Sequence, residues 1–127
     1  MEKTVIRTEN APAPFQGAPY NQAIKVGDLV FVAGQLGLKP GDTAVEGDVA
    51  VQTEQALRNL AAILEAAGSS LANLVKTSVF LQDLGDFAAM NEVYARHVGD
   101  RPPARSTFEV AKLPSGALVE IEAVAHT

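Results

Sequence analysis

The chain contains no cysteine, and this absence excludes several kinds of chemistry at once. Without thiols there is no disulfide framework, no thiolate nucleophile and no cysteine-based metal site. His97 and His126 are the only histidines, and their spacing matches no metal-ligand motif. The chain also lacks a Gly-x-Ser-x-Gly elbow, a Walker loop and a Gly-x-Gly-x-x-Gly turn. We therefore expect neither a metal site nor a cofactor.

Basic residues and long apolar runs are also scarce. Ten lysines and arginines stand against fifteen acidic residues, which gives a net charge of −5. Proteins that bind nucleic acids through phosphates usually present a basic face, so we expect no nucleic-acid partner. No apolar run approaches the roughly 20 residues that span a bilayer, and residues 1–7 lack the apolar core of a signal peptide. We expect a cytoplasmic protein with no membrane partner.

Tryptophan is absent and aromatic residues make up only 6% of the chain, although 47% of its residues are hydrophobic. The core must therefore be built mainly from valine, leucine, isoleucine and alanine. A length of 127 residues is typical of one domain, which we expect to span residues 1–127.

Hydrophobic periodicity predicts strands and helices in the order β-ββ-α-β-α-ββ. A helix is expected from an N-cap at Asp48 to a stop at Gly68, with Glu54, Gln55, Arg58 and Asn59 on its polar side. A second helix is expected from an N-cap at Asp86 to Gly99. The predicted strands before the last quarter of the chain are 4–8, 23–26, 29–33 and 74–81, and Gly27-Asp28 is a predicted hairpin turn between the second and third.

The last quarter of the chain predicts a β-hairpin, with strands in 103–113 and 117–125 around the turn Pro114-Ser115-Gly116. One face of this hairpin would carry Arg105 and Glu109 together with Glu120 and Glu122. If this face is exposed, the charges merely solvate it. If it is covered, they must be paired, either in a salt bridge of Arg105 to one of these glutamates or with a small anionic ligand.

Two amphipathic helices can cover only one face of the predicted sheet. The other face would carry Phe80, Leu118 and Val124 beside Lys76 and several glutamates, including Glu109. An apolar surface of that kind marks an interface, and most such interfaces join copies of one chain. We therefore expect self-association.

Several motifs, in order along the chain, resemble the RidA family, also called YjgF/YER057c/UK114. They are Thr8-Glu9-Asn10-Ala11-Pro12, Pro19-Tyr20, Ala33-Gly34-Gln35, Val75-Lys76-Thr77, Asp86-Phe87, Pro103-Ala104-Arg105-Ser106, Lys112-Leu113-Pro114 and Val119-Glu120-Ile121-Glu122. The resemblance covers nearly the whole chain. It implies an α+β, chorismate-mutase-like protomer with two helices on one face of a mixed sheet, assembled as a homotrimer.

The resemblance also implies an activity: hydrolytic deamination of small carboxylate-bearing imines and enamines. The implied substrates are 2-aminoacrylate, 2-iminopropanoate and 2-iminobutanoate, and the products are 2-oxo acids and ammonia. By this resemblance Arg105 holds the substrate carboxylate and Glu120 orients or activates water. Tyr20, Gly34, Thr107 and, from an adjacent protomer, Asn91 would complete a pocket at the subunit interface.

The sequence departs from the family pattern at three places. Ala33 stands where relatives often carry serine, Thr107 where many carry cysteine, and the loop at 16–18 differs from the common Gly-Pro-Tyr form. The Ala33 change removes a hydroxyl that could bond a ligand or water, and thus bears on rate and substrate preference. Two other functions stay open: a trimer that binds small carboxylates without turnover, and, with less support, a ribonuclease that inhibits translation.

Overall fold

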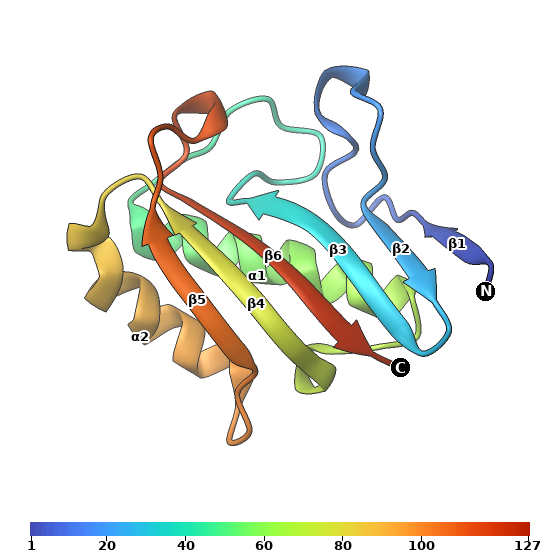
Figure 1. Cartoon of the computed structure of the whole chain (residues 1–127). Helices are drawn as coiled ribbons and strands as arrows, with labels where there is room; N and C mark the ends of the chain where they lie inside the picture. Colours follow the sequence, from blue (N-terminus) through green and yellow to red (C-terminus); the bar gives the residue numbers. More distant parts are fainter.

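In the computed structural model, which describes residues 1–127, six strands form one mixed sheet in the order β1-β2-β3-β6-β4-β5 (Figure 1). The strands are β1 Lys3–Ile6, β2 Ala23–Val26, β3 Leu29–Leu36, β4 Leu74–Leu81, β5 Ala104–Glu109 and β6 Val119–His126. The helices are α1 Val49–Ala66 and α2 Phe87–Val98. Neighbouring strands are antiparallel except β4 and β5, which are parallel and joined through α2. The expected α+β architecture is confirmed.

Local signals set the ends of both helices. The carboxylate of Asp48 accepts a hydrogen bond from the Val51 amide (3.0 Å), and Gly68 follows α1 with φ at 81°, which favours glycine. Gly99 ends α2 in the same way, with φ at 71°. The prediction for Asp86 is only half right: it precedes α2, but its side chain makes no capping bond. Neither helix is long and apolar enough to cross a membrane.

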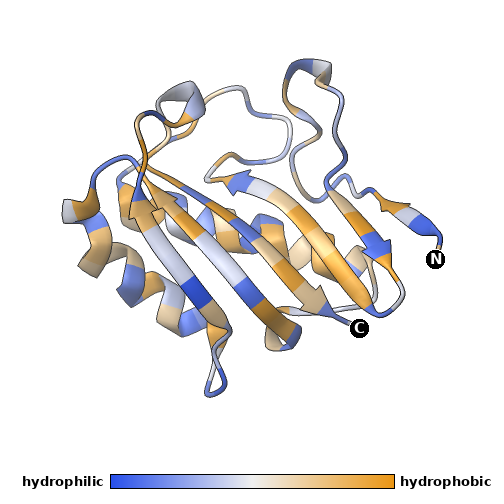
Figure 2. Cartoon of the chain, viewed as in Figure 1, coloured by the Kyte–Doolittle hydropathy of each residue, from blue (hydrophilic) through white to orange (hydrophobic).

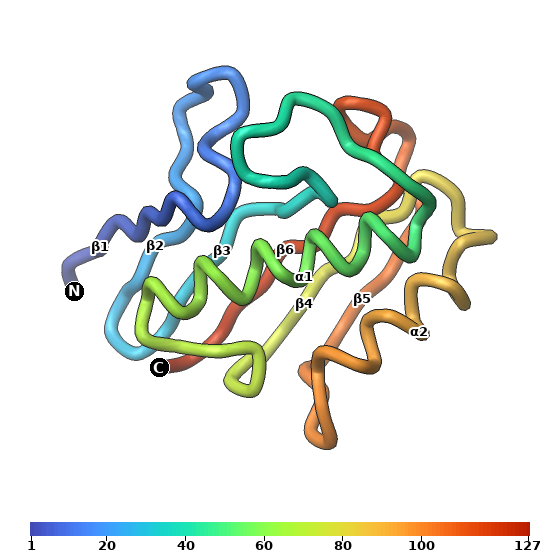
Figure 3. Tube along the Cα trace, turned by 180° about the vertical axis from the view of Figure 1, so that it is seen from behind, coloured from blue at the N-terminus to red at the C-terminus, as the bar shows by residue number.

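Both helices lie against the same face of the sheet (Figure 3). The core between these layers contains valine, leucine, isoleucine and alanine as expected, with Met90 from α2. Its largest fully buried side chains include Leu57, Leu60, Ile63 and Leu64 of α1, Val79 and Leu81 of β4, and Val119 and Ile121 of β6.

Asn59 does not lie on the polar side of α1, where its residue type placed it; it is fully buried. Its side-chain amide donates to the carbonyls of Leu36 (3.1 Å) and Leu38 (2.7 Å), just beyond the end of β3. A buried amide is stable only when its hydrogen bonds are made, and here two loop carbonyls accept them. Asn59 therefore anchors the loop that leaves the sheet.

The predicted hairpin at the end of the chain is wrong. β5 and β6 do not pair with each other, because β4 lies between them. The Val110 amide donates to the carbonyl of Leu81 (3.0 Å), and the Gln82 amide donates to the carbonyl of Leu118 (3.1 Å). The segment that connects β5 to β6 therefore passes over the end of β4. Two antiparallel strands joined by a turn look alike in sequence whether they are adjacent or separated by a third strand, so the pattern could not distinguish them.

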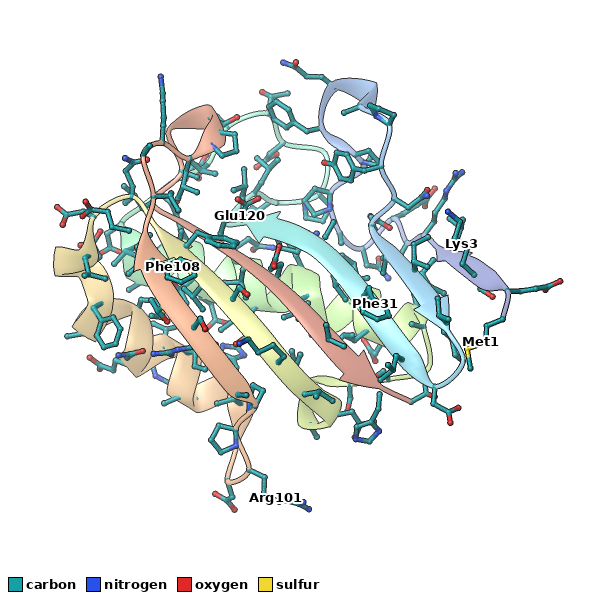
Figure 4. The ribbon with its side chains drawn as sticks, viewed as in Figure 1. Met1, Lys3, Phe31, Arg101, Phe108 and Glu120 are labelled. Carbon is teal, nitrogen blue, oxygen red and sulfur yellow. The ribbon has the colours of Figure 1, made fainter.

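The face of the sheet opposite the helices is open and partly apolar (Figure 2). Phe31 and Phe108 are 46% and 49% exposed there, and both rings are visible on this face in Figure 4. The rings of Phe80 and Phe108 lie 5.9 Å apart. Glu109, which we expected on this face, instead accepts a hydrogen bond from the Leu84 amide (2.9 Å) near the start of α2.

Candidate functional site

The register of the sheet separates the two residues expected to carry the chemistry. Arg105 and Ala123 both pair with Thr77, which is buried under the helices. Glu120 pairs with Phe80, which lies three positions further along β4 and therefore faces the other way. The expectation that Arg105 and Glu120 share a face is wrong, and its cause is the strand that lies between them.

Arg105 is held between aromatic rings on the helix side of the sheet. Its guanidinium carbon lies 4.8 Å from the ring centre of Tyr94 and 5.6 Å from that of Phe87, both on α2. Such contacts attract a cation through the negative face of the ring. The Tyr94 hydroxyl is in turn hydrogen-bonded to that of Thr77 (2.6 Å). Arg105 is thus fixed in direction.

No acidic residue neutralises this arginine. The three ion pairs of the chain involve Arg58, Arg96 and His97. Glu109 is hydrogen-bonded to the backbone near α2, and Glu120 and Glu122 lie on the opposite face. The salt bridge considered from the sequence is therefore absent, and the charge is available to an anionic ligand.

Two buried oxygen atoms without hydrogen-bond partners belong to the same region: Asn91 Oδ1 and Thr107 Oγ1. Thr107 follows Arg105 by two residues and so shares its face of β5. Asn91 lies four residues after Phe87 and three before Tyr94, which places the three side chains on one face of α2. Arg105, Asn91 and Thr107 therefore form one group, hereafter the arginine half-site. In a single chain Asn91 lies on the side of Arg105 and does not need to come from an adjacent protomer.

Glu120 belongs to a second group, hereafter the glutamate half-site. It lines a cavity of about 340 Å³ together with Tyr20, Ala33 and Gly34. The remaining wall is largely apolar, with Pro12, Ala13, Phe15, Leu36, Leu38 and Pro114. Burial raises the pKa of the Glu120 carboxyl above its ordinary value, and the nearby charge of Glu122 raises this pKa further. A carboxyl group of this kind is suited to both accepting and returning a proton.

Gly34 sits against Glu120 where β3 departs from regular pairing. The register with β6 shifts between Val32 and Gln35, as in a β-bulge, and bulges are common beside functional sites. A Cβ at Gly34 would lie 2.5 Å from Glu120 Oε2, which is closer than real contacts allow. The absence of a side chain at Gly34 therefore permits a close approach to the backbone, and the approaching group is the Glu120 carboxylate.

Sequence reasoning missed two residues that shape this half-site. The buried side chain of Gln22 donates to the carbonyls of Thr8, Ala11 and Pro12, and so ties down the loop around the cavity. Phe15 lines the cavity, and its amide donates to the Tyr20 hydroxyl oxygen (2.7 Å). The only signal in the sequence was the Pro- and Gly-rich composition of this loop, which predicts an ordered loop but not which of its side chains face the cavity.

Comparison with known proteins places the chain in a family. The family model described as Endoribonuclease L-PSP matches residues 8–127. The chain belongs to this family, which includes RidA and YjgF.

The relatives cover the chain almost completely. A RutC family protein of Pyrococcus horikoshii is 52% identical over 98% of both chains. The chloroplastic Reactive Intermediate Deaminase A of Arabidopsis thaliana is 47% identical over 98% of this chain and 66% of its own length. Among solved structures, RidA of a Psychrobacter species has a TM-score of 0.93 and 43% identity, covering 98% of this chain and 99% of its own. Escherichia coli TdcF with bound serine has a TM-score of 0.90 and 38% identity, with 98% coverage of both.

Proposed function

We propose that the protein hydrolyses 2-imino acids, and the enamines that tautomerise to them, to 2-oxo acids and ammonia. The observation that carries this proposal is Arg105: a half-buried cation stacked on Tyr94 and Phe87 with no acidic partner. A guanidinium held in this way matches a carboxylate with two parallel hydrogen bonds. The Arabidopsis relative, a reactive intermediate deaminase, supports the activity, and the serine bound to TdcF supports an amino-acid-like ligand.

The glutamate half-site supplies the chemistry. Water attacks C2 of the imine while Glu120 accepts a proton from that water. The protonated carboxyl then returns this proton to the nitrogen, which gives a carbinolamine. Glu120 next takes the proton of the C2 hydroxyl and passes it to the same nitrogen, so that the C–N bond breaks, the C2 carbonyl forms and ammonia leaves. The raised pKa of Glu120 suits this exchange, because the carboxyl must both gain and lose a proton within one cycle.

The two half-sites lie on opposite faces of one sheet, so a single chain cannot present both to one small molecule. We propose that they complete one another across subunits of a homotrimer, the arginine half-site of one protomer with the glutamate half-site of its neighbour. The exposed rings of Phe31 and Phe108 on the open face supply the apolar surface for such contacts.

A coupled assay tests the activity. A threonine dehydratase releases the four-carbon imine, and its disappearance is followed in the ultraviolet with wild-type protein, Arg105→Ala and Arg101→Ala. Arg101 is exposed at the loop before β5 and serves as the matched control for loss of one positive charge (Figure 4). We expect the wild type and Arg101→Ala to accelerate the disappearance of the imine, and Arg105→Ala not to accelerate it. Equal clearance by the wild type and Arg105→Ala would refute the proposal.

Subunit mixing tests the shared site. Arg105→Ala and Glu120→Gln impair different half-sites, so every mixed ring contains one junction at which both residues are intact. Random exchange at equal amounts should restore about one quarter of the wild-type activity. Arg105→Ala mixed with Asn91→Ala should restore none, because both changes fall in the arginine half-site. Restoration in the second mixture, or none in the first despite confirmed exchange, would contradict this arrangement.

Two other functions have less support. Binding of small carboxylates without turnover uses the same Arg105, and the serine bound to TdcF is compatible with it; tight binding of 2-oxobutyrate with no imine turnover would favour it. A ribonuclease, the activity in the family description, would need an acid and a base near RNA phosphates. His97 is instead paired with Glu54, and His126 lies exposed near the chain end.

A further inference from the structure

Phe15 lines the cavity of the glutamate half-site but has no part in the proton transfers assigned to it. Its ring is half-buried without belonging to the hydrophobic core, and it comes from a loop that departs from the usual family form. Together with Pro12, Leu36, Leu38 and Pro114 it forms the apolar part of the cavity lining, hereafter the apolar wall, and the polar part includes Gln22, Gln35 and Glu120. Apolar side chains offer no hydrogen bond to a carboxylate or to ammonia, so this part of the lining does not bind either group.

The backbone holds Phe15 firmly in place. Its amide donates to the Tyr20 hydroxyl oxygen (2.7 Å), and its carbonyl accepts from the Ala18 amide (3.0 Å). The next residue, Gln16, adopts φ at 52°, a left-handed conformation that costs energy for any residue with a side chain. Strained positions of this kind persist where surrounding contacts hold them, and they cluster at ligand sites. The bond to Tyr20 also leaves the tyrosine proton free to donate into the cavity.

The remaining groups of the substrate already have partners. In the proposed function, on which this inference rests, Arg105 takes the carboxylate, and Glu120 and water act at C2 and its nitrogen. Only the side chain of the substrate is then left for the apolar wall. The cavity of about 340 Å³ has room for more than the one or two carbons of the smallest imines.

We propose that Phe15 is a specificity-determining residue, and that the site favours 2-imino acids with branched aliphatic side chains over the three- and four-carbon imines. Burial of one methylene changes affinity by about fourfold. A leucine-derived imine carries three more carbons than an alanine-derived one. If only two of them reach the wall, it should be favoured by about tenfold or more.

The test uses the full-length protein with imines generated in place by an L-amino-acid oxidase from alanine, 2-aminobutyrate and leucine. The ratio of kcat/KM for the leucine-derived to the alanine-derived imine is compared between variants, because this comparison cancels the intrinsic reactivity of each imine. We expect Phe15→Ala to lower the ratio by about fourfold or more and Phe15→Leu to lower it less. Gln16→Gly relaxes the strained residue next to the ring and should keep the ratio.

Three results would overturn the inference. One is a wild type that turns over the alanine-derived imine as well as or better than the leucine-derived one. Another is a Phe15→Ala variant in which kcat/KM falls by the same factor for both substrates, which would mean that the ring supports the site without distinguishing substrate side chains. The third, no turnover of any imine, would refute the proposed function as well, whereas the first two leave it standing.

Discussion

Replacing Gly34 with alanine should damage the site while leaving the fold almost intact. The added Cβ would lie 2.5 Å from Glu120 Oε2 and 2.8 Å from its Cδ, while ordinary contacts begin at 3.4 Å. The carboxylate must therefore retreat by about 0.9 Å. A displacement of about 1 Å of a catalytic group can cost about 100-fold in rate, so we expect a loss of roughly 10- to 100-fold in kcat/KM for the imine.

The stability of Gly34→Ala should change little. The three atoms nearest to the new methyl all belong to the side chain of Glu120, which is flexible and can move away. We expect the free energy of unfolding in urea to fall by less than about 1 kcal/mol. A variant that is unfolded, or that fails to assemble as the wild type does, would show that the contact cannot relax as described.

A double-mutant cycle identifies the cause of the loss. If Gly34→Ala acts by displacing the Glu120 carboxylate, it should have almost no further effect once that carboxylate is gone. The double variant Gly34→Ala/Glu120→Gln should then be about as active as Glu120→Gln alone, so that the two effects are strongly non-additive. The same fold loss from Gly34→Ala in both backgrounds would refute the role assigned to this contact.

Burial raises the pKa of Glu120 above 4.5, so the stability that this group contributes is complete below about that pH and is lost as the pH rises through the raised pKa. Glu120→Gln should therefore melt at a higher temperature than the wild type at neutral pH, and this gain should vanish below pH 4.5. A difference in melting temperature that stays constant with pH would contradict the raised pKa. Asn59→Ala removes the hydrogen bonds to two loop carbonyls and should lower the free energy of unfolding in urea by about 2–4 kcal/mol. Replacing the more exposed Gln55 with alanine should lower it by about 1 kcal/mol or less, and equal losses would contradict the anchoring role of Asn59. Phe31→Asp places a carboxylate on the open face and should dissociate the proposed homotrimer in analytical ultracentrifugation, whereas Val51→Asp on α1 should not. A Phe31→Asp variant that remains a trimer would place that face outside the interface.

The sequence by itself determined those features whose causes are local. Asp48 and Gly68 bound α1 because a capping carboxylate and a left-handed glycine act within one turn of the helix. Gly27-Asp28 joins β2 and β3 because a tight turn needs only those two residues. The alternation along β6 placed Val119 in the core and Glu120 on the other face, since side-chain direction alternates along any strand. The family resemblance added the candidate residues but not their arrangement.

Only the tertiary structure decided which strands became neighbours, and the site depends on that choice. A strand bonds with whichever strand lies beside it, and sequence proximity does not fix which one. Because β4 lies between β5 and β6, Arg105 faces the helices while Glu120 faces the open side. The missing acidic partner of Arg105 and the cavity around Glu120 likewise arise from segments far apart in the chain. Such contacts form only when the strands and helices have assembled around the sheet, so no local sequence pattern encodes them.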